Sequence, residues 1–174
     1  LYQSRELNLV KELLKVVTSS YAIIIYLLAL TFVIYSSSAG NFFVGDDFTW
    51  FRWAADCTSN SAISECPKTL ERVSSYFTQA EGFFYRPGTK TYFLLMYSGF
   101  WLNQTAYHVV SIFLHFIVTI LIFLISRKIL KNFLLSALAA FLFIIISGYS
   151  EAVFWVSATG HLFNAIFVLL SLYF

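Results

Sequence analysis

The sequence predicts an all-α integral membrane protein, a multi-span helical bundle with a large first extracytoplasmic loop that carries juxtamembrane helices. Of the 174 residues, 59% are hydrophobic and 11% are charged, and the mean hydropathy is +0.76. Soluble domains carry about 25% charged and about 45–50% apolar residues, so this composition argues against a soluble enzyme and against a disordered chain. The net charge of +2 is too small for a nucleic-acid-binding surface, and no nucleic-acid partner is expected.

The positions of the acidic residues also support this fold class. Eight of the nine lie at or before Glu81, and the ninth is Glu151. Elsewhere, stretches without any charged residue reach the ~20 residues that a spanning helix needs. Carboxylates are costly in hydrocarbon, so the acids mark segments outside the bilayer. Because the chain begins at Leu1 and ends inside an apolar run at Phe174, we expect it to be the N-terminal part of a larger membrane protein.

The first elements are defined by their charges. Residues 1–15 have apolar side chains at helical spacing among basic ones, which predicts a cytoplasmic amphipathic helix on the membrane surface. Residues 16–38 carry no charge and predict the first span. Residues 39–105 hold six acids, both cysteines and both prolines, which predicts a solvent-facing loop.

The uncharged stretch at 91–126 is too long for one span and breaks at Asn103. Its first part is too short to cross and predicts an interfacial helix over 89–102, with Tyr and Trp at headgroup depth. The remaining predicted segments are a second span at 106–126, a cytoplasmic turn at 127–132, a third span at 133–148, an extracytoplasmic link at 149–160 and a fourth, truncated span at 161–174.

The basic residues predict the orientation. Three bases precede the first span, and three between positions 127 and 131 follow the second. Two crossings separate these clusters, so the positive-inside rule puts both on the cytoplasmic side. The loop at 39–105 and the link at 149–160 then face the non-cytoplasmic side.

Two cysteines lie in the predicted outer loop. An oxidising compartment would let Cys57 and Cys66 pair, and the spacing permits a small closed loop. Two free thiols are the alternative. Zinc is disfavoured, because no His lies nearby to complete a site.

Asp46 and Asp47 are the first candidate catalytic residues. They follow an apolar segment at the outer mouth of the first span and precede an aromatic one. Adjacent carboxyl groups in an apolar setting suit a general base that acts on a hydroxyl acceptor. The alternative is that they only cap or solvate a helix start.

Glu151 is the second acidic candidate, placed on the same outer side by the predicted topology. A lone Glu beside Trp155 at a membrane edge is costly unless it is paired or functional. The alternative is a solvated loop carboxylate. We therefore treat both residues as candidate substrate contacts.

Basic and imidazole groups complete the candidate site. Arg86 stands beside a proline before the predicted interfacial helix, with Lys90 one turn later. This arrangement suits a phosphate or pyrophosphate, although interfacial snorkelling is the alternative. His108 is expected at the outer end of its span, in reach of substrate, whereas His115 lies deeper and is favoured to have a structural role.

Four sequence elements occur in a familiar order. They are NFFVGDDFTW, YRPGTKTYFLLMYSGFWLN, AYHVVSIFLHFIV and SGYSEAVFWVSATGHLFNA. From about Asn41 to Phe174, the chain resembles the GT-C superfamily of integral membrane glycosyltransferases, especially the protein O-mannosyltransferase branch and its bacterial relatives. The branch often has Pro or His-Pro before the Glu link and an Arg after the Trp, whereas this chain has Ser147–Tyr149 and Thr159–Gly160. The sugar and the acceptor are therefore open.

The resemblance implies a function. A sugar would pass from a polyprenyl-phosphate donor to a hydroxyl-bearing acceptor (protein, lipid or glycan) at the non-cytoplasmic face of the lipid bilayer. It assigns Asp46 and Asp47, without a choice between them, to the base or to acceptor binding. Glu151 takes the second acidic position, and Arg86 the position near the lipid phosphate. The adjacent Asp pair leaves a divalent metal as an option, with no other cofactor implied.

Two other functions are compatible with these residues. A transporter or flippase for lipid-linked sugars would also hold polar groups in a membrane groove, but such sites lie near the bilayer midplane. The predicted spans are free of charged residues, which disfavours transport. The other possible function is that of a structural membrane subunit, in which the acidic residues have no chemical role.

Overall fold

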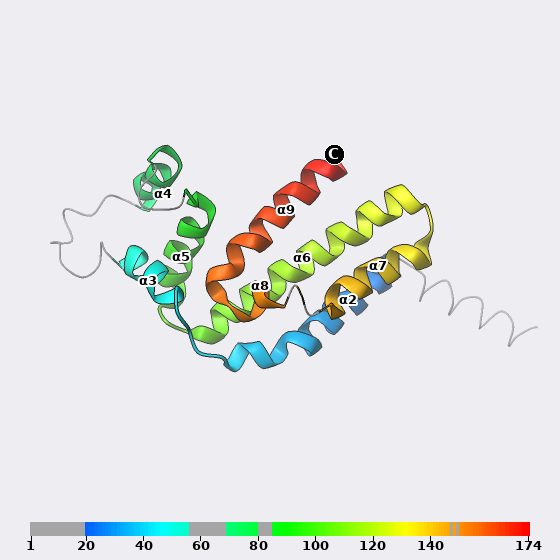
Figure 1. Cartoon of the computed structure of the whole chain (residues 1–174), viewed down its shortest axis with the longest axis horizontal. Helices are drawn as coiled ribbons and strands as arrows, with labels where there is room; N and C mark the ends of the chain where they lie inside the picture. Colours follow the sequence, from blue (N-terminus) through cyan, green and yellow to red (C-terminus); the bar gives the residue numbers. More distant parts are fainter. Residues whose placement is uncertain (1–19, 56–68, 80–84, 147, 149) are drawn as a thin grey trace, which may run out of the picture.

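The structure, a computed structural model, describes residues 20–55, 69–79, 85–146, 148 and 150–174. No described residue lies in a β-strand. The predicted helix at 1–15 and both cysteines, Cys57 and Cys66, lie outside the described residues. The main elements are α2 (Ser20–Tyr35), η1 (Ser36–Gly40), α3 (Asp47–Ala55), α4 (Thr69–Thr78), α5 (Pro87–Phe100), α6 (Gln104–Leu130), α7 (Phe133–Ile145), α8 (Glu151–Phe154), η3 (Val156–Ala158) and α9 (Thr159–Tyr173) (Figure 1).

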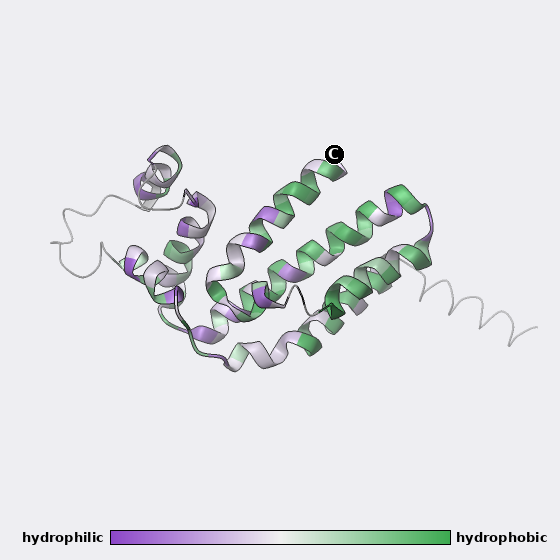
Figure 2. Ribbon diagram, viewed as in Figure 1, coloured by the Kyte–Doolittle hydropathy of each residue, from purple (hydrophilic) through white to green (hydrophobic). Residues whose placement is uncertain are grey.

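Three helical segments of the described chain are long and apolar enough to cross a membrane. They are Tyr21–Gly40, Gln104–Leu130 and Val156–Tyr173, and they overlap the predicted first, second and fourth spans. Hydrophobic residues dominate α2, α6 and α7, whereas hydrophilic residues are frequent in α3 and α4 (Figure 2). The chain therefore has the helical character of a membrane protein.

Helices α6 and α9 run side by side in the same direction (Figure 1). Near their N-terminal ends, the hydroxyl oxygens of Ser111 and Thr159 lie 3.3 Å apart. Near their C-terminal ends, Lys128 Nζ donates to the carbonyl oxygen of Tyr173 at 2.5 Å. The basic residues that follow the second predicted span therefore lie at the opposite end of α6 from α8 and η3.

Helices α6 and α7 differ in length from the spans predicted at 106–126 and 133–148. Arg127 and Lys128 are not in a turn, because α6 continues to Leu130 and only Lys131 and Asn132 separate it from α7. Lys131 takes the left-handed conformation with φ 52°, which ends α6. The Asn132 side chain accepts a hydrogen bond from Leu135 N at 3.2 Å, which caps α7.

Helix α7 is also shorter than the predicted third span at 133–148. It has 13 residues and is about 20 Å long, less than the ~30 Å of a bilayer core. The Tyr35 hydroxyl donates to the carbonyl oxygen of Ile144 at 2.9 Å, so the last turn of α7 is held against the end of α2. The link that follows, including α8, packs against α6.

Aromatic packing positions helices α3 and α5. The buried rings of α3 and α5 form one cluster with the first turns of α6, and Phe51 meets both Phe93 and Tyr107 edge-on. Trp50 stacks on Phe93, with ring centres 5.7 Å apart. Burial raises the pKa of Tyr92 in the same cluster, so its phenol stays neutral. This cluster fixes α3 and α5 against the N-terminal ends of α6 and α9.

Candidate functional site

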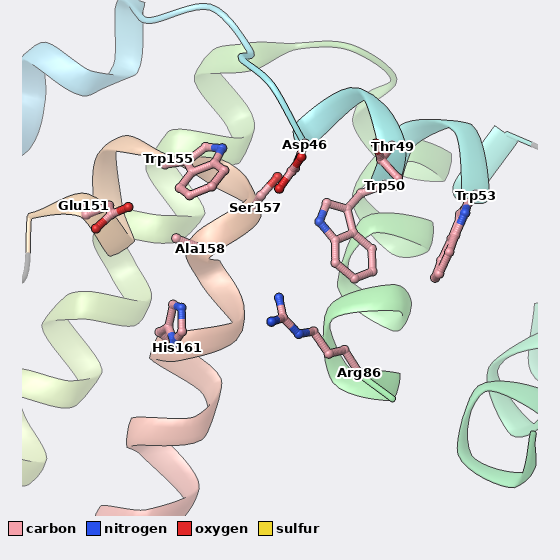
Figure 3. A pocket seen from close by; sticks show the side chains of 10 residues that line it. All are labelled: Asp46, Thr49, Trp50, Trp53, Arg86, Glu151, Trp155, Ser157, Ala158 and His161. Carbon is pink, nitrogen blue, oxygen red and sulfur yellow. The ribbon is translucent and has the colours of Figure 1, made fainter. Parts of the chain in front are cut away.

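A cavity of about 370 Å³ lies where α3, α5, α8, η3 and α9 meet. Its wall combines acidic, basic, hydroxyl and indole side chains (Figure 3). We call it the central cavity, and its lining residues are Asp46, Thr49, Trp50, Trp53, Arg86, Glu151, Trp155, Ser157, Ala158 and His161.

Asp47 has a structural position beside this cavity. Its side chain is only 1% exposed, and its Oδ1 accepts hydrogen bonds from Ser157 N at 2.7 Å and from the Ser157 hydroxyl. Its Oδ2 accepts from Val44 N at 3.0 Å. The carboxylate thus joins the start of α3 to η3, which lies far along the chain.

Asp46 has the opposite environment. It is exposed and lines the central cavity, next to Ser157 in Figure 3. The buried carboxylate of Asp47 is occupied by three donors, so the Asp46 carboxylate is the member of the pair that can meet a ligand. The sequence did not separate these two roles.

Arg86 and Glu151 reach the same cavity from distant segments. Arg86 immediately precedes α5, which starts with Pro87, and its guanidinium points toward His161 across the cavity (Figure 3). Glu151 begins α8 and is exposed. The structure therefore brings Asp46, Arg86 and Glu151 to one chamber.

Indole rings form much of the remaining wall. Trp155 lines the cavity, and its buried Nε1 has no hydrogen-bond partner. Lys90 makes a cation–π contact with Trp53: its Nζ lies 4.3 Å from the Trp53 ring centre and 5.4 Å from that of Tyr76. Rigid aromatic rings beside carboxylates suit a ligand with both apolar and hydroxyl surfaces, such as a sugar.

Lys90 and His108 do not line the central cavity. Lys90 is 6% exposed and packs against the aromatic rings described above, so it supports the wall. His108 is 1% exposed, with its Nδ1 3.4 Å from the carbonyl oxygen of Val153, so it connects α6 to α8. Neither side chain is placed to touch a ligand in the central cavity.

His161 is the principal lining residue that sequence reasoning missed. It lies in the first turns of α9, is exposed, and lines the central cavity. Its signal was its place ten residues after Glu151, where a helical start follows a polar link. Ser157 and Thr49 were missed as well, because isolated hydroxyl residues carry no chemical signal in sequence.

Two further cavities adjoin the central one along α9. The first, of about 480 Å³, is the α6–α9 cavity, lined by His115, Val118, Ile122, Phe143, Gly148, Glu151, Ala152, Ala158, His161, Leu162, Ala165, Val168 and Leu169. The second, of about 570 Å³, is the α5–α9 cavity, lined by Phe77, Tyr85, Arg86, Pro87, Gly88, Thr89, Ser157, Gly160, His161, Phe163, Asn164 and Phe167. His161 lines all three cavities.

The described residues contain no group of three His, Cys, Asp or Glu side chains placed to hold a metal ion. Asp46 and Glu151 reach the central cavity as separate carboxylates, and Asp47 is occupied by its own donors. The Asp pair therefore does not act as a joint ligand set.

Comparison of the chain with protein-family models, with curated proteins and with solved structures gives no match.

Proposed function

We propose that the protein is a membrane glycosyltransferase that moves a sugar from a polyprenyl-phosphate donor to a hydroxyl acceptor at the non-cytoplasmic face. The observation that carries this proposal is the central cavity, because it gathers Asp46, Arg86 and Glu151 from three separate segments. The cavity also adjoins two cavities that follow α9, which forms with η3 a segment, Val156–Tyr173, that is long and apolar enough to span a membrane. Such a site suits an amphiphile whose polar end must meet a base and a cation.

The reaction assigns one task to each group. The acceptor hydroxyl oxygen attacks the anomeric carbon of the donor and forms the new glycosidic bond. The bond from that carbon to the phosphate oxygen breaks, and the lipid phosphate leaves with the electron pair. Asp46 accepts the proton of the acceptor hydroxyl, and Arg86 offsets the negative charge on the departing phosphate.

The remaining wall residues position the substrates. Trp50 and Trp53 offer flat apolar faces to a sugar ring. Glu151 lines both the central and the α6–α9 cavities, where its carboxylate accepts a hydrogen bond from a substrate hydroxyl. Asp47 and Lys90 are positioning residues, since each acts through a neighbouring group.

Asp46→Asn tests the base assignment. The substitution keeps the shape of the side chain but removes its basicity, so sugar transfer from a polyprenyl-phosphate sugar in membranes should fall by about a hundredfold or more. Glu71→Gln is the matched control, because Glu71 is an exposed carboxylate on α4 that lines none of the three cavities. Undiminished transfer by Asp46→Asn would remove Asp46 as the base.

A transporter or flippase for lipid-linked sugars is the second candidate function. One observation favours it: His115, an ionisable residue in a helix long enough to span, lines the α6–α9 cavity. A flippase would move a fluorescent lipid-linked sugar between the leaflets of a proteoliposome without cleaving it. A transferase would release polyprenyl phosphate. Measuring the lipid-linked sugar that changes leaflet and the polyprenyl phosphate that is released therefore separates the two functions.

A further inference from the structure

The α6–α9 cavity contains a polar side chain without a partner. His115 is 0% exposed, and neither of its ring nitrogens has a hydrogen-bond partner. Its ring stacks on Phe143 at 4.8 Å and meets Tyr35 edge-on at 5.0 Å, so packing holds it in place. An unsatisfied buried polar group is costly, and a ligand in the cavity that His115 lines would supply the missing bond.

Most of the other side chains that line this cavity are apolar. Val118 and Ile122 on α6 face Leu162 and Val168 on α9. Helix α6 is long and apolar enough to span a membrane, and so is the segment Val156–Tyr173 that η3 and α9 form together. A cavity of about 480 Å³ between two such helices suits the hydrocarbon chain of a lipid.

The polar end of the α6–α9 cavity lies near His115. Glu151 and His161 line both this cavity and the central cavity. The Tyr35 ring lies 5.0 Å from the His115 ring and 5.9 Å from the Phe154 ring, so His115 and α8 share this ring as a neighbour. The group that meets His115 therefore belongs to the headgroup end of the lipid.

We propose that the α6–α9 cavity binds the acceptor, and that the acceptor is a hydroxyl-bearing lipid with an ester or amide group. The chain lies between α6 and α9, the ester or amide carbonyl accepts a hydrogen bond from His115, and the hydroxyl enters the central cavity beside Glu151. This inference rests on the proposed glycosyl transfer, because it names the acceptor class for that reaction.

The donor then occupies the other side of α9. Arg86, assigned to the phosphate, lines the central and α5–α9 cavities but is not among the residues of the α6–α9 cavity. A polyprenyl chain is a hydrocarbon and offers nothing to His115. Two amphiphiles thus lie on opposite faces of α9, and their polar ends meet where the three cavities join at His161.

Photolabelling tests this site without sugar transfer. The full chain in lipid nanodiscs is exposed to a diacylglycerol that carries a photoactivatable group and an alkyne on one acyl chain. A dialkyl ether glycerol with the same hydroxyl, chains and labels is the matched probe without carbonyl groups. The ester probe should label α6 and α9 around the cavity, and the ether probe should label them roughly fivefold less, as expected for one lost hydrogen bond.

Adjacent positions on α9 provide matched variants. Ala165 lines the α6–α9 cavity and Asn164 lines the α5–α9 cavity, so Ala165→Trp should abolish labelling by both probes, whereas Asn164→Trp should leave it unchanged. Ala165→Leu serves as a smaller obstruction if the tryptophan variant does not fold. His115→Phe keeps the aromatic packing but removes the nitrogens, so the preference for the ester probe should disappear.

Four results would overturn the inference. They are wild-type labelling in the folded Ala165 variants, an ester preference that survives His115→Phe, stronger labelling of the cavity by a photoactivatable polyprenyl phosphate, and no labelling by any probe.

Different results would contradict the proposed glycosyl transfer. If the lipid labels as expected but the wild type transfers no sugar, the lipid site stands and the transferase does not. If sugar passes only to a soluble acceptor, at an unchanged rate in Ala165→Leu, the transferase stands and the lipid acceptor does not.

Discussion

Asp46 and Asp47 are neighbours in the chain, yet the fold gives them different tasks. The Asp47 carboxylate is enclosed and accepts two hydrogen bonds from Ser157 and one from Val44. Asp46 faces the central cavity. A helix start explains the difference, because successive residues there point in different directions and only one of them can face the cavity.

Asp47→Asn should lower stability. The amide nitrogen that replaces one carboxylate oxygen cannot accept a hydrogen bond, so either Val44 N or both buried donors of Ser157 lose their acceptor. We expect a loss of about 1–3 kcal/mol, measured by thermal unfolding in detergent. Ser157→Ala should cost about 0.5–1.5 kcal/mol, because the backbone donor at 157 is retained.

Asp46→Asn is the matched comparison for stability. Its side chain is exposed, so its unfolding temperature should equal that of the wild type. If Asp47→Asn also unfolds at the wild-type temperature, the two hydrogen bonds from Ser157 do not hold α3 to η3.

Helices α5 and α9 approach each other closely at Gly160. A Cβ atom at this position would lie 2.7 Å from Thr89 Oγ1, and Thr89 is buried in the first turn of α5. The close approach places Arg86, which precedes α5, across the central cavity from His161 on α9. The absence of a side chain at Gly160 therefore sets the separation of two cavity walls.

Gly160→Ala should separate these helices. We expect a destabilisation of about 1–3 kcal/mol from overpacking, together with lower sugar transfer. Thr89→Ala in the same chain should recover most of the stability, since it removes the clashing oxygen, and a double-mutant cycle measures this coupling.

Gly99 provides the control for helix propensity. It lies in α5, and no atom would come within 4 Å of an added Cβ. Gly99→Ala should therefore stabilise the protein by about 0.5–1 kcal/mol. Equal effects at Gly99 and Gly160 would show that the contact with Thr89 is unimportant.

At the scale of the whole molecule, the two ends of α6 have different chemistry. Its first turns lie beside η3 and α9 at the candidate site, as the Ser111 contact to Thr159 shows. Its last turn carries Arg127 and Lys128. If α6 spans the membrane, the positive-inside rule places the candidate site on the non-cytoplasmic side.

Single cysteines test this orientation. In a background with Cys57 and Cys66 replaced by serine, Arg52→Cys on α3 and Lys131→Cys after α6 place one exposed thiol at each end. In intact cells, a membrane-impermeant maleimide should label position 52 directly and position 131 only after permeabilisation. The reverse pattern would invert the predicted topology.

Much of the helical framework was predictable because it depends on local composition. Uncharged stretches located the helices now seen as α2, α6 and α9, and the proline after Arg86 marked the start of α5. The end of α6 and the length of α7 were not predictable. The Lys131 backbone conformation ends α6, and a contact between Tyr35 and Ile144, 109 residues apart, accompanies the end of α7.

The candidate site divides in the same way. Sequence position singled out Asp46, Asp47, Arg86 and Glu151, because charged residues are costly in a membrane and these lie beside the predicted spans or the predicted interfacial helix. The sequence did not show which of Asp46 and Asp47 faces the cavity. It also did not show that Lys90 and His108 lie outside the cavity lining and that His161 belongs to it. Those assignments depend on which way each side chain points after distant segments pack.

The sequence by itself determined a mostly apolar, helical chain with a few charged residues in the segments between its long apolar helices, since hydropathy and charge act locally. The tertiary structure decided which of those residues share a cavity. Packing of α3, α5 and the α8–α9 segment around the start of α6 joins positions about a hundred residues apart, and no local pattern encodes such contacts.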